Sequence, residues 1–479
     1  MNPKLQLHHE ESNPLPITQG HLLDFPRDPI ACMRSLHAQH GDMAALEEEG
    51  SRLYFVFHPQ LNHRVLSDPL TFHSRFFAIR GPRHSAQRRL TSGLLSMNGE
   101  QHKRNRRLVM EAFHKKALLG YLPIIQQTCE EMLADWHCGQ ERDLARDMTE
   151  FMLKLTGRML FGTDDPDLVL TIGQMIDQWV HLNHEVGIGA FLSCPEITHK
   201  YDELLLFAEQ LEHQVSRLLQ RRRQVPTTCP AQDMLSLLIT AHDELGALSD
   251  QELVGQTTLI FGAAHLTTAH TLTWTLFLLA QHPSVSARLW HALDQQLDGG
   301  FPSLEAVDAI SELEYVIKES MRILPASAYS QRFTSGPVEL GPFELNYGAT
   351  VIFSQFITHH RADLYPEPER FLPERWQQIN PSPYAYLPFG AGPRMCLGGP
   401  LALVILKTVL PTILQRFKLM LVPSSEVSGR VISTMLSPTT PVLMKLYPPD
   451  GRFVAQPVEG NIHELVDLRE IPRRLRQAA

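Results

Sequence analysis

The segment 389–398 contains residues whose types and spacing favour metal chemistry. Cys396 follows a glycine-rich stretch and precedes a long apolar segment that we expect to be helical. A thiol at the start of a helix faces backbone N–H groups and the positive end of the helix dipole, which lower its pKa and favour the thiolate that ligates iron. Arg394 would reach an anionic group. The glycines that allow a tight turn and the approach of a flat macrocycle are Gly390, Gly392 and Gly398. An inert buried cysteine beside a glycine turn is the alternative.

This segment resembles the haem loop of the cytochrome P-450 superfamily, whose pattern is F-x-x-G-x-R-x-C-x-G. The matching residues are Phe389, Gly392, Arg394, Cys396 and Gly398. The resemblance implies that Cys396 is the proximal iron ligand of haem b and that Phe389 packs beside the sulfur. It covers about residues 20–450. It also implies the cytochrome P-450 fold, which is mainly α with small β sheets.

A second match lies upstream, in the sequence Lys-Glu-Ser-Met-Arg. Glu319 and Arg322 are three residues apart, so they share a helix face and can pair. Such a pair alone usually marks a solvated helix surface. The family has an E-x-x-R pair joined by an arginine from a downstream P-E-R-F/W segment, which Arg375 supplies here. The resemblance therefore implies that these three residues form a buried charge network supporting the haem loop, and loss of one member would leave the others unpaired.

Three further basic residues resemble the family's haem propionate ligands. His102 and Arg106 are four residues apart in a predicted helix, and Arg332 follows Pro325. Each alone is more often a surface residue. Together they predict a set of cations around one anionic cofactor.

The segment 261–269 resembles the family's oxygen-binding helix but departs from its pattern. Thr267 falls on the threonine whose hydroxyl would bond to bound dioxygen and steady proton delivery, and Thr268 follows it. The usual acid before that threonine is Leu266, so His265, ordered water or the substrate would have to supply protons. There is an alternative to each catalytic role. The Thr267 hydroxyl could bond to a carbonyl of its own helix, and His265 could face away into the core. Peroxide-driven oxidation or isomerase chemistry would avoid the need for an acid.

The resemblance also predicts the residues that line the substrate pocket. They are mostly small or apolar: Leu259, Gly262, Ala263, Leu266, Ala326, Tyr329 and Met435. We therefore expect a hydrophobic small molecule as substrate.

Two groups of basic residues suggest partners. The segment 69–99 has no Asp or Glu and contains five arginines: Arg75, Arg80, Arg83, Arg88 and Arg89. This group could bind an acidic substrate or an acyl carrier protein, or it could be a solvated loop. The second group would suit an acidic ferredoxin or flavodoxin and contains Lys103, Arg104, Arg107, Lys115 and Lys116. Because only about 80 residues follow Cys396, we expect a separate redox partner with its own reductase.

The elements that must position these residues are mostly helices. Apolar residues recur every three or four positions from about 100 to 300, and the uncharged segment 253–280 predicts a buried helix because its seven threonines and two histidines are too polar for lipid. Short strands are predicted at 52–58 and within 325–355. A proline-rich passage (365–394) and a last helix from about 398 follow. Long polar linkers are missing, so we predict one large domain over 1–479 with irregular tails at about 1–20 and 451–479.

Composition limits the alternatives. The 479 residues have a formal net charge of −9, which argues against a nucleic-acid binder. The six cysteines form no CxxC pair, and the first fifty residues lack an unbroken apolar run. We therefore expect a cytoplasmic protein with no membrane anchor.

The sequence predicts a haem-thiolate monooxygenase that inserts one oxygen atom from O2 into a hydrophobic molecule. A peroxygenase or haem-thiolate isomerase is the alternative within enzymes. A haem-based sensor or electron carrier, and a helical scaffold without haem, are alternatives of other classes.

Overall fold

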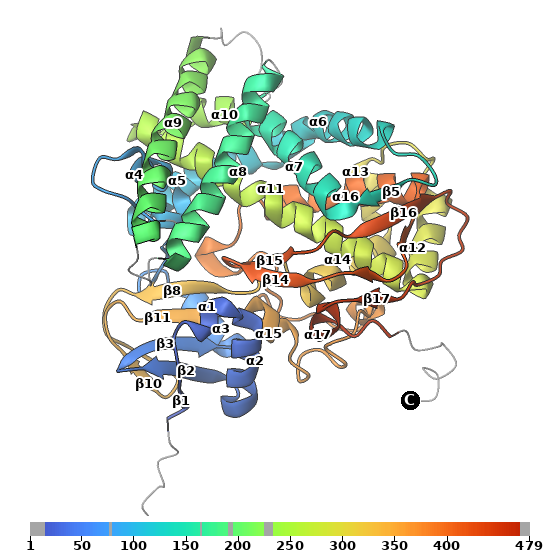
Figure 1. The fold of residues 1–479 in the computed structure, drawn as a ribbon. Helices are drawn as coiled ribbons and strands as arrows, with labels where there is room; N and C mark the ends of the chain where they lie inside the picture. Colours follow the sequence, from blue (N-terminus) through green and yellow to red (C-terminus); the bar gives the residue numbers. More distant parts are fainter. Residues whose placement is uncertain (1–14, 76–78, 163–164, 190–194, 225–232, 470–479) are drawn as a thin grey trace, which may run out of the picture.

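The structure is a computed structural model that describes residues 15–75, 79–162, 165–189, 195–224 and 233–469. Helices make up most of it, and the largest sheet lies at one side of the helical part (Figure 1). The mainly α architecture with small sheets is therefore confirmed.

Helix α11 (Asp250–Gln281) runs through the middle of the helical part (Figure 1). It begins with a capping box, in which the Ser249 hydroxyl accepts from the N–H of Glu252 and the Glu252 carboxylate accepts from the N–H of Ser249. Apolar side chains lie on all sides of the helix, as in helices surrounded by other elements. It packs against α7, α14 and α16, so the prediction of a buried helix at 253–280 is confirmed.

Other helices surround α11 or flank it in the chain. They are α4 (Ala86–Leu90), α5 (Gly99–Met110), α6 (Lys115–Ala134), α7 (Leu144–Phe161), α8 (Pro166–Gly189), α9 (Pro195–Gln224), α10 (Met234–Thr240), α12 (Pro283–Gln296), α13 (Leu304–Asp308), α14 (Ser311–Ile323) and α16 (Gly399–Arg416). Helix α16 begins just after Cys396, and Pro400 lies in its first turn, where a missing N–H costs nothing. The predicted helix after the cysteine is thus confirmed.

The largest sheet has the strand order β1-β2-β3-β11-β8-β4. Its strands are β1 (Ile17–Gln19), β2 (Met43–Glu48), β3 (Ser51–Val56), β11 (Thr350–Phe353), β8 (Ser330–Thr334) and β4 (Phe72–His73). Val351 pairs with Tyr54 in the parallel direction and with Arg332 in the antiparallel direction. This register fixes Arg332 on a strand beside the centre of the sheet. Helices α1 (Asp24–Arg27), α2 (Pro29–His40), α3 (Pro59–Ser67) and α15 (Gln355–His359) lie near this sheet (Figure 1).

Smaller sheets join distant parts of the chain. They comprise β12 (Lys418–Leu421) with β16 (Leu443–Tyr447) and β5 (Glu141–Asp143), β14 (Gly429–Ile432) with β15 (Met435–Pro438), β9 (Val338–Leu340) with β10 (Phe343–Leu345), β6 (His242–Asp243) with β7 (Gly246–Ala247), and β13 (Ser425–Glu426) with β17 (Val458–Glu459). The β14–β15 hairpin is tied to α11, because the Trp274 indole N–H donates to the carbonyl of Leu436 at 3.0 Å.

Both predicted tails contain regular structure within their described parts. Strand β1 pairs with β2 from Ile17 onward, and β17 and α17 (Ile462–Leu465) lie in the segment 451–469. Ile462 and Val466 are buried. The prediction of irregular tails was wrong here because elements of two to four residues are too short to show a periodic pattern.

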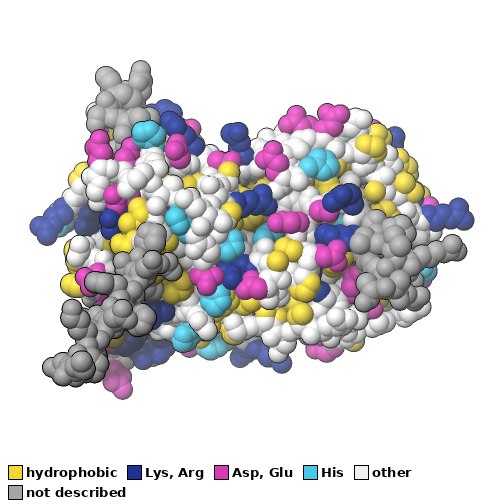
Figure 2. Space-filling view, turned by 90° about the horizontal axis from the view of Figure 1, so that it is seen from below, with side chains coloured by type: hydrophobic (Ala, Val, Ile, Leu, Met, Phe, Trp, Pro, Cys, Tyr) yellow, Lys and Arg dark blue, Asp and Glu magenta, His cyan; other side chains and the backbone are white. Residues whose placement is uncertain are grey.

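Among the described residues, no helix has the length and apolarity needed to cross a membrane. On the face shown in Figure 2, acidic and basic side chains lie intermixed.

Candidate active site

The Cys396 loop is held in place by its own backbone and by α3. The N–H of Cys396 donates to the carbonyl of Phe389 at 2.9 Å, and the N–H of Met395 donates to that of Gly392 at 3.0 Å. Gly392 has a φ of +72°, and a Cβ there would collide with the carbonyl oxygen of Leu66. Only glycine fits both the conformation and the close approach.

The surroundings of the thiol differ from the sequence prediction. Cys396 has exposed surface, but the protein packed around its thiol desolvates the charged form and thereby raises the pKa of Cys396. The N–H groups of Gly398 and Gly399 and the charge of Arg106 act in the opposite direction but do not outweigh this desolvation. The predicted effect of the helix start is present, but the predicted net lowering of the pKa was wrong. In this arrangement a bound cation would be needed to hold the thiolate.

Phe389 and Gly398 adjoin the cysteine. A Cβ on Gly399 would lie 3.2 Å from the Phe389 ring, so this ring packs against the first turn of α16. A Cβ on Gly398 would lie 3.8 Å from the sulfur of Cys396. Gly398 therefore lies directly beside the sulfur.

The four predicted propionate ligands come together from three parts of the chain. The Arg394 guanidinium donates to the Asn98 side-chain oxygen at 2.7 Å and to the carbonyl of Met97, just before α5. Arg106 of α5 donates to the carbonyl of Met395 at 2.7 Å.

Mutual repulsion shows that these cations are close together. Burial and then the charge of Arg394 lower the pKa of Arg332 to about 10, and burial and then Arg106 lower that of Arg394 to about 10. Burial lowers the pKa of His102 to about 4, with contributions from Arg394, Arg106 and Arg332. The three arginines form one positive site, and His102 beside them is neutral near pH 7.

This positive site lacks an anion within the described part of the chain. None of its three arginines is ion-paired with a described carboxylate, and the Nε of Arg394 is buried without a hydrogen-bond partner. Buried cations are normally paired. The two propionates of a haem are anions that would complete the site, so the residues present fit the group.

The face of α11 that carries Thr267 is partly accessible to solvent. Ala263 is exposed although most residues of α11 are buried, and Gly262, Leu266 and Thr267 are partly exposed. The Thr267 hydroxyl donates to the carbonyl of Ala263 at 2.8 Å, which is the back-bonded geometry considered above. Its oxygen can still accept a hydrogen bond. Thr268 is buried.

His265 lies on the opposite face of α11 from Thr267, because residues two positions apart in an α-helix point in directions about 200° apart around the helix axis. It is fully buried. Its Nδ1 contacts the carbonyl of Phe261 at 3.1 Å, and its Nε2 contacts the carboxylate of Asp177 on α8 at 3.1 Å. Both nitrogens have partners, so this placement argues against the predicted catalytic role and favours the alternative of a satisfied core histidine.

The predicted pocket residues separate into two groups. The residues that are partly or fully exposed on α11 are Leu259, Gly262, Ala263 and Leu266. Ala326 lies beside the β14–β15 hairpin, because its carbonyl accepts a hydrogen bond from the N–H of Leu436 at 3.1 Å. Met435, on the same hairpin, forms a β-bridge with Ser327. Tyr329 is buried instead. Its hydroxyl donates to the carbonyl of Ser433 at 2.7 Å, and its ring packs edge-on against Phe25 with centroids 4.9 Å apart.

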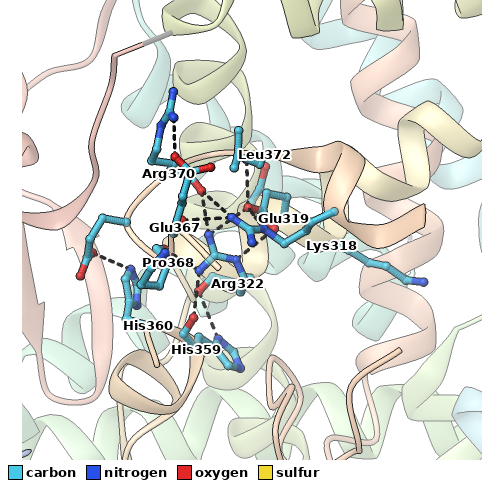
Figure 3. Close-up of polar contacts among 12 residues, drawn as sticks. Lys318, Glu319, Arg322, His359, His360, Glu367, Pro368, Arg370 and Leu372 are labelled. Atoms are coloured by element: carbon cyan, nitrogen blue, oxygen red, sulfur yellow. Dashed lines mark hydrogen bonds and ion pairs between the residues drawn. The ribbon is translucent and has the colours of Figure 1, made fainter. Parts of the chain in front are cut away.

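The structure brings Glu319, Arg322 and Arg375 together in a buried cluster. Figure 3 shows Glu319 and Arg322 of this cluster side by side. Arg322 donates two hydrogen bonds to the Glu319 carboxylate, at 2.9 and 3.0 Å, and Arg375 donates one at 2.9 Å. Burial alone would raise the pKa of Glu319, but the two arginines outweigh it and hold the pKa below its usual range.

The remaining donors of this network reach backbone carbonyls. Arg322 donates to the carbonyls of His359, Pro368 and Arg370 at 2.8 to 2.9 Å (Figure 3). Arg375 donates to those of Pro366 and Glu367 at 2.6 and 3.1 Å. The charges thereby fix the proline-rich passage that leads to the Cys396 loop.

The two basic groups are partly neutralised. In the first, Arg89 pairs with Glu212 of α9 at 2.6 Å and Arg75 stacks on the Phe333 ring at 4.4 Å. In the second, Arg104 and Arg107 pair with Asp243 at 3.2 and 2.8 Å, and Lys103 pairs with Glu100 at 2.6 Å. Besides Arg75, the groups without an ion pair to a described residue are Arg80, Arg83, Arg88, Lys115 and Lys116.

Sequence reasoning missed several residues that hold the site. Asn98 anchors Arg394, Asp177 pairs with His265, and Trp376 donates its indole N–H to the Glu319 carboxylate at 2.9 Å. Asn98 and Asp177 are distant in sequence from their partners, so no local pattern could have revealed them. Trp376 directly follows Arg375 and could have been considered.

The thiol loop, the arginines without an ion pair and the partly exposed face of α11 fit a haem protein. The sequence matches the cytochrome P450 family model over residues 11–446, so the chain belongs to the cytochrome P-450 family. It is therefore a haem b monooxygenase, an oxidoreductase.

Two bacterial relatives are similar over most of their length. Cyclooctat-9-en-7-ol 5-monooxygenase of Streptomyces melanosporofaciens is 29% identical over 418 residues, which cover 85% of this chain and 88% of the relative. Pentalenene oxygenase of Streptomyces avermitilis is 28% identical over 433 residues, which cover 88% and 93%.

Solved structures agree in fold. The haem domain of cytochrome P450DA superposes with a TM-score of 0.76 at 23% identity, covering 89% of this chain and 94% of that one. Retinoic-acid-bound cyanobacterial CYP120A1 gives a TM-score of 0.74 at 23% identity, covering 87% and 93%.

Proposed function

We propose that this protein inserts one oxygen atom into a cyclic, terpenoid-like hydrocarbon or alcohol. The names of two relatives that match over most of their length carry this proposal, since one acts on cyclooctat-9-en-7-ol and the other on pentalenene. The small and apolar residues along α11 support it, because Gly262, Ala263 and Leu266 offer few hydrogen bonds to a substrate.

The chain's own residues have distinct tasks in this proposal. Haem b supplies the iron at which O2 is activated. Cys396 would ligate that iron, with Phe389 and Gly398 shaping the space beside the sulfur. His102, Arg106, Arg332 and Arg394 would bind the propionates. Thr267 would offer its hydroxyl oxygen as a hydrogen-bond acceptor on the substrate side, and the apolar residues of α11 would exclude water there.

The overall reaction fixes what must be supplied. A C–H bond, O2, two electrons and two protons give a C–OH bond and one water. We propose that the electrons come from a separate acidic ferredoxin or flavodoxin with its reductase, docking on exposed cations that include Lys115 and Lys116. The rate at which the partner reduces this protein should fall as the salt concentration is raised, because salt screens exposed charges.

The proposal is tested by reconstitution with a ferredoxin, its reductase and isotopically labelled O2. Cyclic hydrocarbons and alcohols are screened first by the shift of the Soret band and then by mass spectrometry of the products. We expect one labelled oxygen atom in the product and label in the water. Binding only of linear acids, or a product without label, would contradict the proposal.

Peroxide-driven oxidation is the second candidate, and the absence of an acid at Leu266 favours it. The segment 253–280 has no carboxylate at all. Replacing Leu266→Glu and measuring product per reduced cofactor distinguishes the candidates. A peroxygenase should form product with hydrogen peroxide alone and show no gain from the new acid.

An acidic substrate or carrier protein remains a finer proposal for the first basic group. Burial, then Arg88 and Arg75, lower the pKa of Arg80, so these three guanidinium groups lie near one another. If these arginines bind a carboxylate, Arg80→Ala should weaken the binding of an acid but leave the binding of its neutral ester unchanged. Equal affinity of the two compounds for the unaltered protein would remove this proposal.

A further inference from the structure

The buried histidine at position 270 is not used by any step above. His270 lies on α11, three residues after Thr267 and seven after Ala263. Residues at these spacings share one helix face, with Cβ atoms of positions three apart about 5–6 Å from each other. His270 therefore continues the partly exposed face of α11, one turn beyond Thr267.

The ring of His270 lacks a hydrogen-bond partner at one of its nitrogens. It is 8% exposed, and its Nδ1 is buried without a hydrogen bond from the described residues. By contrast, His265 on the opposite face of the same helix has partners at both nitrogens. A buried polar group without a partner destabilises the fold. We therefore looked for a function of the unpartnered His270 ring nitrogen.

The ring is neutral near pH 7. Burial lowers the pKa of His270 to about 4, and the neighbouring His265, which pairs with Asp177, acts in the same direction. A neutral imidazole has one N–H donor and one nitrogen acceptor, so it can accept a proton on one side while donating on the other.

We propose that His270 relays protons to the Thr267 side of α11, in place of the carboxylate that Leu266 cannot provide. One ring nitrogen releases its proton toward the Thr267 hydroxyl or a water bonded to it, and the other takes a proton from water. The ring ends neutral in its other tautomer, and no electron moves. This inference rests on the proposed oxygen insertion, which consumes two protons.

The test compares His270→Leu and His270→Gln with Gln281→Leu in the haem-loaded enzyme. Gln281 is a matched control, because it ends the same helix, is 4% exposed and also has a buried side-chain nitrogen, Nε2, without a partner. Measured are product per electron pair, hydrogen peroxide released, the solvent isotope effect on turnover, the substrate-induced Soret shift and the melting temperature.

For His270→Leu we expect about a tenfold or greater fall in product per electron pair, with the missing electrons recovered as hydrogen peroxide. The Soret shift should persist, and the melting temperature should stay equal or rise, because an unpartnered polar group is removed. His270→Gln should recover part of the coupling, and Gln281→Leu should leave it unchanged.

Unchanged coupling and isotope effect in His270→Leu would overturn the proposal. So would a fall in coupling that accompanies a lower melting temperature and a lost Soret shift, since these indicate a packing role. Failure of the proposed function is a separate result, because the unaltered enzyme would then form no oxygenated product at all.

Discussion

At the scale of single residues, the site contains charges that stabilise each other and charges that do not. Glu319, Arg322 and Arg375 satisfy one another and the nearby carbonyls. Arg332 and Arg394 repel each other, and neither forms an ion pair with a described carboxylate. The first set should determine the stability of the empty protein, and the second its affinity for haem.

Removing Arg322 should be costly. Arg322→Ala deprives the buried Glu319 carboxylate of two hydrogen bonds and removes one hydrogen bond from each of three backbone carbonyls. We expect a loss of about 3–5 kcal/mol in the free energy of unfolding, measured in urea. Arg146→Ala is the control, because Arg146 and Glu150 form an exposed pair with side chains 75% and 51% exposed, and it should have no measurable effect. Similar effects of both substitutions would contradict the account.

His359 should make stability depend on pH. Its Nδ1 contacts the carbonyl of Arg322 at 3.2 Å and its Nε2 accepts from the N–H of Leu387 at 2.7 Å, so only the neutral ring makes both bonds. Burial, then the charge of Arg322, lower the pKa of His359 to about 3. Since the unfolded state takes up a proton near pH 6.5, this stability is complete above 6.5 and is lost as the pH falls toward 3.

The size of this effect can be isolated with His359→Gln, which does not titrate. Between pH 6 and 4 the unaltered protein should lose about 1.4 kcal/mol more per pH unit than the variant. Unfolding in urea at several pH values measures the difference. Parallel curves for the two proteins would show that the histidine is not buried and neutral.

At the scale of elements, α11 is positioned by direct contact between backbones. A Cβ on Gly255 of α11 would lie 2.5 Å from the Ser92 hydroxyl and 2.9 Å from the N–H nitrogen of Gly93. The loop between α4 and η1 (Leu94–Ser96) therefore packs on the helix backbone, and it also leads to Asn98, which holds Arg394.

Gly255→Ala should push these two elements apart. Overpacking of this kind costs about 1–3 kcal/mol, and the displaced loop should also weaken haem retention. Gly120→Ala in α6 is the matched control, since nothing lies within 4 Å of the added atom, and it should stabilise the protein by about 0.4–1 kcal/mol. Thermal unfolding and haem content measure both effects. A tolerated Gly255→Ala would mean that this contact is looser than described.

How far the sequence predicts this molecule depends on whether a feature is local. The Cys396 loop, the Glu319–Arg322 pair and the buried helix at 253–280 each lie within a short segment, and the structure has all three as expected. The partners of Arg394 and His265 come from other elements, so only the fold reveals them. The pKa of Cys396 was misjudged because the desolvation that raises it comes from the whole surrounding protein.

At the scale of the whole molecule, helices and sheets converge on one place. Helix α11 supplies the Thr267 face, α5 and β8 supply cations, and α16 begins beside the thiol. The formal net charge of −9 does not favour binding of a polyanion, and the face in Figure 2 shows acidic and basic side chains intermixed.

The central claim is that the sulfur of Cys396 ligates haem iron. The most direct measurement is the absorption spectrum of the reduced protein with carbon monoxide, which separates thiolate-ligated haem from other ligation. We predict the thiolate-type Soret band for the unaltered protein and for Cys138→Ser, whose cysteine is exposed elsewhere, and its loss in Cys396→Ser. A thiolate-type band that persists in Cys396→Ser, or is missing from the haem-loaded unaltered protein, would contradict the account.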